Sequence, residues 1–205
     1  MFVSEIFKSI QGEGVNAGQE AVFLRLSGCN FRCNWCDTKY AWEKGKEMSV
    51  EEVVDKVLSY GVEHLVITGG EPLLQQEELG QVLDELPERF YVELETNGSV
   101  ECKLEGKLDL ITCSPKLKNS GVEEYELKIG SDEKVYYKFV IERAGDVEEV
   151  KKYLRKWNIP VSRVVLMPLG TEREVVLERE AMVKKLCEQG EYIFSPRLHI
   201  VQGIK

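Results

Sequence analysis

The sequence predicts an α/β fold: a reduced, partial (β/α) barrel of about six parallel strands with fewer helices. Short β-rich runs alternate with amphipathic helices along the chain, and this alternation favours parallel strands joined by right-handed crossovers. Residues 97–109 are too few and too polar to form a good helix, so at least one crossover is expected to lack one. At 205 residues the chain fits a single domain, residues 1–205, which can bury about 70% of the surface of its unfolded form.

Six segments rich in β-branched and aromatic residues are predicted as strands, and four amphipathic segments as helices. The strands are residues 21–26, 64–68, 90–96, 108–113, 135–141 and 163–167. The helices run from Ser49 until Gly61, over residues 79–86 before Pro87, from Asp146 to Trp157, and over about 174–190. Ser49 and Asp146 are each followed three residues later by a glutamate, a pattern typical of a capping box.

The composition limits the kinds of partner. The formal net charge is −9 and the isoelectric point about 5.0, so nonspecific binding to nucleic acid is not expected and a small-molecule substrate fits better. The amino terminus lacks a basic region followed by an apolar run, and no stretch of about 18 uncharged apolar residues occurs. We therefore expect neither a signal peptide nor a membrane span. The scattered Cys102, Cys113 and Cys187 favour a reducing, cytoplasmic compartment.

The other three cysteines, Cys29, Cys33 and Cys36, lie within eight positions in the pattern CxxxCxxC. Short spacings of this kind are typical of iron-sulfur ligands. Three thiolates can bind three irons of a four-iron cluster and leave the fourth iron for another ligand. The alternative is a zinc site of three cysteines completed by His64 or His199. His64 opens a predicted strand, at the end away from the cysteines, which favours a structural role for it.

Glycines and polar residues follow the predicted strands where these strands end, and in a barrel of this kind such loops meet at one rim. The stretch TGGEP, Thr68 to Pro72, places two glycines and the Glu71 carboxylate at a strand end, where backbone can approach a ligand and the acid can meet an ammonium group. An ordinary tight turn is the alternative for this stretch.

Two basic residues lie within predicted strands. Arg25 lies between Leu24 and Leu26, so it faces opposite to them, and an inward guanidinium needs an anion. An outward, solvated arginine is the less favoured alternative. Lys138 also lies within a strand, and the sequence leaves open whether it is functional or faces outward.

CxxxCxxC after the first predicted strand and GGEP after the second resemble the radical S-adenosylmethionine superfamily. In that superfamily the open iron of a [4Fe-4S] cluster is chelated by the methionine amino and carboxylate groups of S-adenosylmethionine, which supplies the missing fourth ligand. Further stretches resemble the 7-carboxy-7-deazaguanine synthase family of queuosine biosynthesis. They are SIQGEG (9–14), VFLRLSGCN (22–30), CDT (36–38), TGGEP (68–72), ETNG (95–98), SPK (114–116) and the final HIVQGIK.

The resemblance implies a radical S-adenosylmethionine lyase that converts 6-carboxy-5,6,7,8-tetrahydropterin to 7-carboxy-7-deazaguanine with loss of ammonia. It implies that the substrate is held by Ile10, Gln11, Gly12, Glu13, Arg25, Thr68, His199 and Lys205. It implies S-adenosylmethionine contacts from Trp35, Cys36, Asp37, Gly70, Glu71, Ser114, Pro115, Lys116 and Met167. Cys29, Cys33 and Cys36 would hold the cluster, and the Thr38 hydroxyl would bind Mg2+, with water and substrate oxygens as its other ligands. No residue is implied as a general acid or base.

The resemblance also implies a flavodoxin or ferredoxin-type electron donor and a homodimer. Two rivals remain at this point. A glycyl-radical activase shares CxxxCxxC and GGEP but would leave QGEG, Thr38 and Arg25 without an evident role. A noncatalytic electron-transfer or zinc protein would leave the other convergent loops unexplained.

Overall fold

The computed structural model describes residues 1–204, which form one curved nine-stranded sheet in the order β3-β1-β2-β4-β5-β6-β7-β8-β9. Its strands are β1 Phe2–Ile10, β2 Glu20–Leu26, β3 Lys46–Glu47, β4 His64–Gly69, β5 Tyr91–Thr96, β6 Leu110–Cys113, β7 Val135–Ile141, β8 Val164–Pro168 and β9 Ile193–Phe194. All neighbours from β2 to β9 pair in parallel, whereas β1 pairs antiparallel with β2 and β3. The sheet is therefore a partial barrel, with short strands at both edges.

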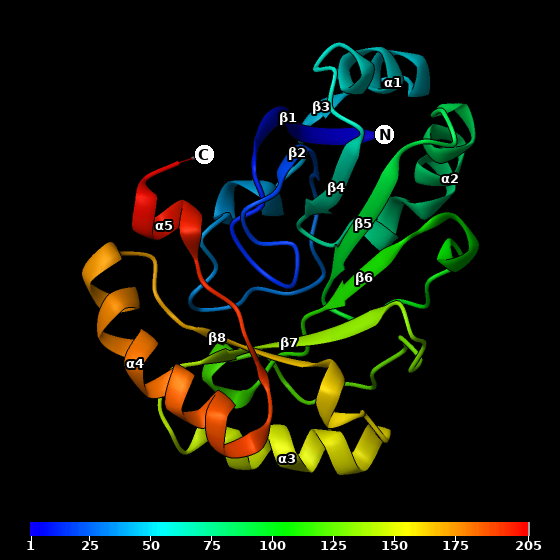
Figure 1. Cartoon of the computed structure of the whole chain (residues 1–205). Helices are drawn as coiled ribbons and strands as arrows, with labels where there is room; N and C mark the ends of the chain where they lie inside the picture. Colours follow the sequence, from blue (N-terminus) through cyan, green and yellow to red (C-terminus); the bar gives the residue numbers. More distant parts are fainter. Residues whose placement is uncertain (205) are drawn as a thin grey trace.

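The six predicted strands are confirmed as β2, β4, β5, β6, β7 and β8, consecutive in the sheet. The helices are α1 Val50–Leu58, α2 Gln76–Glu85, α3 Asp146–Trp157, α4 Arg173–Gly190 and the short α5 Leu198–Gln202. Figure 1 shows α1 to α4 on the outer side of the curved sheet. As expected, no α-helix separates β5 from β6 in the described chain; it has a single 3₁₀ turn there, Glu105–Lys107.

The two predicted capping boxes had different outcomes. At α1 the box is present: the Ser49 hydroxyl accepts from the Glu52 amide, and the Glu52 carboxylate accepts from the Ser49 amide. At α3 the prediction was wrong, because Gly145 is the N-cap and makes no side-chain cap. The Asp146 carboxylate instead accepts from the backbone amides of Glu142 and Arg143 and so orders the turn before the helix.

Strand β1 was not predicted, and its pairing with β2 explains why. The register shifts between Val3 and Glu5, as at a β-bulge, which moves later residues to the other face. Val3 packs in the main core with the helices, whereas Phe7 stacks on Phe23, with ring centroids 5.1 Å apart, in a separate inner cluster. A strict alternation of apolar residues is therefore absent from the sequence.

The sheet divides the interior into two environments. Its outer face carries the main apolar core shared with α1 to α4, including the fully buried Leu24, Leu65 and Ile67. Its inner face carries charged and polar residues, among them Arg25 and Lys138. No helix of the described chain is long and apolar enough to cross a membrane.

Candidate active site

A cavity of about 390 Å³ opens at the carboxyl ends of the parallel strands, where such folds place their sites. Nearly all residues singled out in the sequence line it. From the proposed substrate set these are Ile10, Gln11, Gly12, Glu13, Arg25, Thr68 and His199, and from the cofactor sets Cys29, Cys33, Trp35, Cys36, Asp37, Thr38, Gly70, Ser114, Lys116 and Met167. Pro115 and Glu71 are not among the lining residues, and Lys205 lies outside the described residues.

The three clustered cysteines follow β2 and face this cavity. The three sulfur atoms do not all lie within 4.8 Å of one another. Among the described residues only Glu13, Asp37 and His199 form a group of candidate metal ligands that does. Zinc–sulfur bonds of about 2.3 Å would bring tetrahedral sulfur ligands closer together than this limit. In the metal-free chain the three thiols do not converge to this spacing, and the thiolates of a cluster, which bind different irons, need no such convergence.

The two histidines considered as zinc ligands contact carboxylates, not the cysteines. His64 is buried, with its Nε2 3.4 Å from a Glu93 carboxylate oxygen, and it does not line the cavity. His199 faces Glu13 and Asp37, at 3.6 and 3.8 Å. Burial raises the pKa of the Cys29 and Cys33 thiols, so both are protonated in the metal-free protein and release protons when they bind iron.

The GG turn packs directly on the cysteine loop. The Glu71 amide donates to the Gly28 carbonyl oxygen at 2.8 Å, and a Cβ at Gly70 would overlap that carbonyl and approach the Cys29 Cβ. Gly69 has φ +143°, a conformation that side chains disfavour. Glycine is required here because the backbones of two site loops touch.

Gly70→Ala should therefore lower the free energy of unfolding by about 1–3 kcal/mol, the usual cost of overpacking, and should reduce iron retention because the cysteine loop must move. Urea unfolding and iron content would measure both effects. Gly106→Ala is the matched control, since nothing lies within 4 Å of a Cβ there. Equal effects of the two substitutions would contradict the packing argument.

The structure corrects the expectation for Glu71. Its side chain is fully buried, and its two oxygens accept from the backbone amides of Leu73 and Asn97 and from the Thr96 hydroxyl, at 3.0, 2.7 and 2.8 Å. Burial raises its pKa, which these hydrogen bonds partly offset. The carboxylate is occupied in joining the ends of β4 and β5, so it orders the GGEP turn and does not face the cavity.

The other cofactor candidates form one wall. Lys116 Nζ donates to the Ser114 hydroxyl at 2.9 Å and lies 5.6 Å from the centre of a Trp35 ring. Trp35 Nε1 donates to Asn119 Oδ1 at 3.1 Å, which fixes the indole beside the cysteine loop. The Lys116 ammonium, the Ser114 hydroxyl and the Trp35 ring suit a ligand with a carboxylate and an adenine, as S-adenosylmethionine has.

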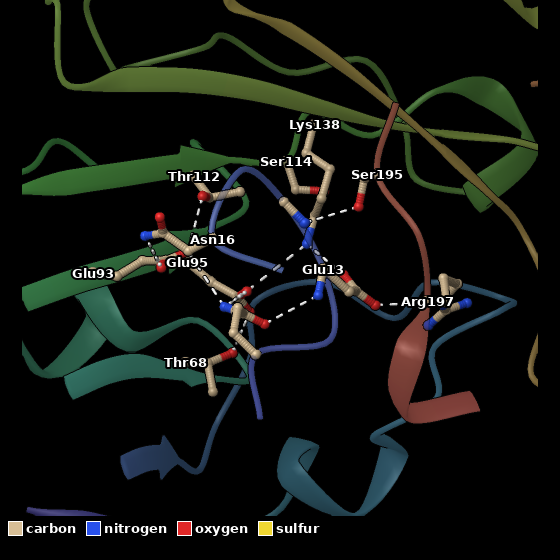
Figure 2. Close-up of polar contacts among 12 residues, drawn as sticks. Glu13, Asn16, Thr68, Glu93, Glu95, Thr112, Ser114, Lys138, Ser195 and Arg197 are labelled. Carbon is tan, nitrogen blue, oxygen red and sulfur yellow. Dashed lines mark hydrogen bonds and ion pairs between the residues drawn. The ribbon is translucent and has the colours of Figure 1, made fainter. Parts of the chain in front are cut away.

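A compact ionic cluster, drawn in Figure 2, lines another part of the cavity. Lys138 Nζ lies 2.5 Å from a Glu13 oxygen and 3.9 Å from a Glu95 oxygen, and Arg197 Nε lies 3.2 Å from the other Glu13 oxygen. Burial raises the pKa of Glu13, but Lys138, Arg197 and His199 outweigh burial and hold it well below 4.5. Burial lowers the pKa of Lys138, and the facing carboxylates more than reverse that effect. Both groups are charged at neutral pH.

Glu13, Asp37 and His199 are the one group of three candidate metal ligands with donor atoms within 4.8 Å among the described residues. Both carboxylates already bond to Arg197, and Glu13 also to Lys138. Two carboxylates balanced by two fixed cations leave little need for a metal ion. We therefore interpret this group as an ion-pair cluster.

Arg25 faces inward, as its position between Leu24 and Leu26 predicted. Its Nε lies 3.0 Å from a Glu5 carboxylate oxygen, which also accepts from the Tyr40 hydroxyl at 2.8 Å. Burial and the bond to Glu5 raise the pKa of Tyr40 to about 12, against the opposing charge of Arg25. The arginine thus has a protein anion and still borders the cavity.

A buried polar network lies beneath the cavity. Gln11, 2% exposed, donates through Nε2 to Glu93 and Glu95 at 3.3 and 3.2 Å, and accepts from the Glu13 amide at 3.2 Å. Thr68 donates to the other Glu95 oxygen at 2.9 Å. Because both ends of the Gln11 amide are engaged, its orientation is fixed, and it in turn orients Glu95 toward the cavity.

Glu13→Gln should destabilise the protein by about 3–5 kcal/mol at pH 7, since it leaves Lys138 partly uncompensated. A depressed carboxyl pKa stabilises the fold above the ordinary pKa of 4.5, and this contribution is lost as pH falls through the folded value. The difference from wild type should therefore shrink between pH 5 and pH 3. Urea unfolding at both pH values would measure it. Glu20→Gln, in an exposed pair with Lys8, should cost under about 1 kcal/mol; a pH-independent Glu13 effect would contradict the argument.

Three site residues were not assigned from the sequence. Lys138 was left open, Glu95 was noted as part of ETNG only, and Arg197 was missed. Lys138 lies between Tyr137 and Phe139, which are buried, so the alternation argument used for Arg25 could have placed it. Arg197 gives no such signal, because its partners Glu13 and Asp37 are 184 and 160 residues away.

Comparison with known proteins agrees with this geometry. A family model described as the radical SAM superfamily matches residues 24–186. The 7-carboxy-7-deazaguanine synthase of Pyrobaculum aerophilum is 43% identical over 209 residues, which cover 97% of this chain and 93% of the relative. The chain belongs to this family of radical SAM enzymes. The 7-carboxy-7-deazaguanine synthase of Hyperthermus butylicus is 38% identical, and the match covers 97% of this chain and 91% of that relative.

Comparison with solved structures supports the fold. The crystal structure of QueE from Escherichia coli superposes with a TM-score of 0.69 at 25% identity, over 95% of this chain and 92% of that chain. A more distant neighbour, SuiB from Streptococcus suis, has a TM-score of 0.55 at 14% identity and supports the fold alone. The predicted partial barrel and the predicted family are confirmed.

Proposed function

We propose that the chain converts 6-carboxy-5,6,7,8-tetrahydropterin to 7-carboxy-7-deazaguanine, with ring contraction and loss of ammonia. One observation carries this proposal most: the three cysteines and the ionic cluster of Glu13 and Lys138 line the same cavity of about 390 Å³. That volume is in the range of small-molecule sites. The similarity to the synthases of two archaea over nearly the whole chain supports the same substrate.

The cofactors would occupy the wall formed by the cysteine loop. Cys29, Cys33 and Cys36 would hold a [4Fe-4S] cluster, and Trp35, Gly70 and the Ser114–Lys116 loop would hold S-adenosylmethionine. Together, when bound, they supply one-electron chemistry that abstracts a hydrogen atom from the substrate. The chain itself positions the reactants and excludes water from the cavity.

The pterin would lie against the part of the cavity that the ionic cluster lines. Its 2-amino group and ring amide present two N–H donors side by side, which match a carboxylate, and Glu95 carries a carboxylate that is 23% exposed toward the cavity. Gln11 and Thr68 fix the two Glu95 oxygens. Arg25, which is paired with Glu5 through Nε and also borders the cavity, would bind the substrate carboxylate, and His199 would cover the ligand.

The remaining features are proposed from the same resemblance. The Thr38 hydroxyl, which borders the cavity 3.6 Å from Cys36 Sγ, would bind Mg2+ with substrate oxygens completing the shell. A flavodoxin or ferredoxin-type protein would supply electrons. We also propose a single-domain, cytoplasmic protein that forms a homodimer.

Anaerobic turnover tests the proposal. The reconstituted protein should convert the carboxytetrahydropterin to the deazaguanine acid in the presence of dithionite, S-adenosylmethionine and Mg2+, with the product followed by mass. Cys33→Ala should abolish turnover and lower iron content, because one cluster ligand is lost, whereas Cys102→Ala, distant in sequence and buried, should retain iron. Cleavage of S-adenosylmethionine with the pterin left untouched would refute the substrate and favour an activase.

A further inference from the structure

The carboxyl-terminal segment of residues 195–199 lies across the hairpin that joins β1 to β2. The Leu198 amide donates to the Gly12 carbonyl oxygen at 2.9 Å, and the Gly14 amide donates to the Ser195 hydroxyl at 2.8 Å. A Cβ at Gly12 would overlap the His199 imidazole. The segment and the hairpin are therefore in direct contact over several residues, although they come from opposite ends of the chain.

Arg197 extends this contact to two other loops. Its side chain is buried, with 4% of the residue exposed. Its Nε donates to Glu13 of the hairpin at 3.2 Å, its Nη2 to Asp37 of the cysteine loop, and its Nη1 to the Gly170 carbonyl oxygen after β8. Figure 2 shows Lys138 and Arg197 approaching Glu13 from different sides, Arg197 from the right. One guanidinium thus joins three separate segments of the site.

The two carboxylates that Arg197 joins come from different loops of the cavity lining, and their oxygens lie within 4.8 Å of each other. Glu13 is in the wall assigned to the pterin, and Asp37 lies between Cys36 and Thr38 in the wall assigned to the cofactors. Without a cation between them, two carboxylates this close would repel. A planar guanidinium can bond to both at once, whereas a lysine ammonium of similar reach cannot supply the same fork. The guanidinium therefore links the hairpin that carries Glu13 to the loop that carries Asp37.

We propose that Arg197 is a positioning residue that couples pterin binding at the hairpin to S-adenosylmethionine binding at the cysteine loop. The proposal rests on the proposed function, since it needs both ligands. A pterin that bonds to the hairpin orders Glu13, and through Arg197 it orders Asp37 and the adjoining cofactor contacts. Each ligand should then raise the affinity for the other by the same factor.

The test measures binding in the reconstituted, unreduced holoenzyme, in which no turnover occurs. Calorimetry gives the dissociation constant of S-adenosylmethionine with and without saturating carboxytetrahydropterin. In the wild type the pterin should tighten binding by about 5- to 150-fold, the usual range for coupled sites. In Arg197→Met the ratio should fall below about threefold, and Arg197→Lys should lie between. After reduction, Arg197→Met should release more 5'-deoxyadenosine per molecule of product.

Arg179→Met is the matched control. Arg179 donates to the Leu169 carbonyl oxygen, next to Gly170, at 2.8 Å and faces Glu142 at 3.8 Å, not Glu13 or Asp37, so its loss should leave the coupling ratio unchanged. If Arg197→Met does not fold, Asp37→Ala removes the acceptor of one arm and keeps the bonds to Glu13 and Gly170, and it should lower the ratio equally. A wild-type ratio in the folded variants would overturn the coupling alone. A wild type that does not bind the pterin would overturn the proposed function with it.

Discussion

Lys138→Met should destabilise the protein by about 3–5 kcal/mol and lower turnover at least about 100-fold. The substitution removes the cation from between Glu13 and Glu95, at 2.5 and 3.9 Å, and leaves two carboxylates facing each other with little solvent. Breaking a buried pair costs this much because the remaining charge is uncompensated. Urea unfolding gives the first quantity, and anaerobic turnover at saturating substrate gives the second.

Two variants separate the charge effect from simple loss of a long side chain. Lys134→Met removes a lysine just before β7 that donates to the Leu108 carbonyl oxygen, and it should cost about 1 kcal/mol of stability with little change in turnover. The double variant Lys138→Met with Glu13→Gln should lose less free energy of unfolding than the two single variants lose together, because it removes one cation and one anion at once. Strict additivity would show that the pair contributes little.

The parallel strands could be predicted from the sequence because each is a short β-rich run between turn residues, and burial of residues on both faces of strands such as β4 and β8 gives a nearly continuous apolar run. The failures have specific physical causes. The register shift between Val3 and Glu5 hides β1 by reversing which residues are apolar on each face. Strands β3 and β9 are two residues each, and α5 is five, so none presents a period to detect.

The candidate site likewise has parts that could be predicted from the sequence and parts that could not. The cysteine loop and the GGEP turn could be recognised because their residues are close in sequence. The Glu71 carboxylate was expected to face a ligand because the sequence shows that it follows a strand but not which groups donate hydrogen bonds to it. In the structure three buried donors of the protein bond to it. The pairs of Lys138 and Arg197 with Glu13, 125 and 184 residues apart, exist only after the barrel has formed.

Glu95→Gln should lower kcat/KM for the carboxytetrahydropterin by about 10²–10³ and leave the KM for S-adenosylmethionine within about twofold. The Gln amide presents an NH2 donor group where the carboxylate presents its second acceptor oxygen, so one of the two pterin N–H donors would lose its partner. Leaving a buried polar group unpaired lowers the affinity of such a site for its substrate strongly. Steady-state kinetics with each substrate varied in turn would measure both constants.

Glu93→Gln distinguishes recognition of the substrate from support of the fold. Glu93 precedes Glu95 by two residues on the same face of β5, is fully buried, and bonds to Gln11, Asn16 and Thr112 without lining the cavity. Its substitution should lower the free energy of unfolding by about 1–3 kcal/mol and leave the pterin KM within about threefold. If instead both glutamine variants changed the pterin KM equally, the network beneath the cavity, and not the Glu95 carboxylate itself, would set the affinity for the pterin.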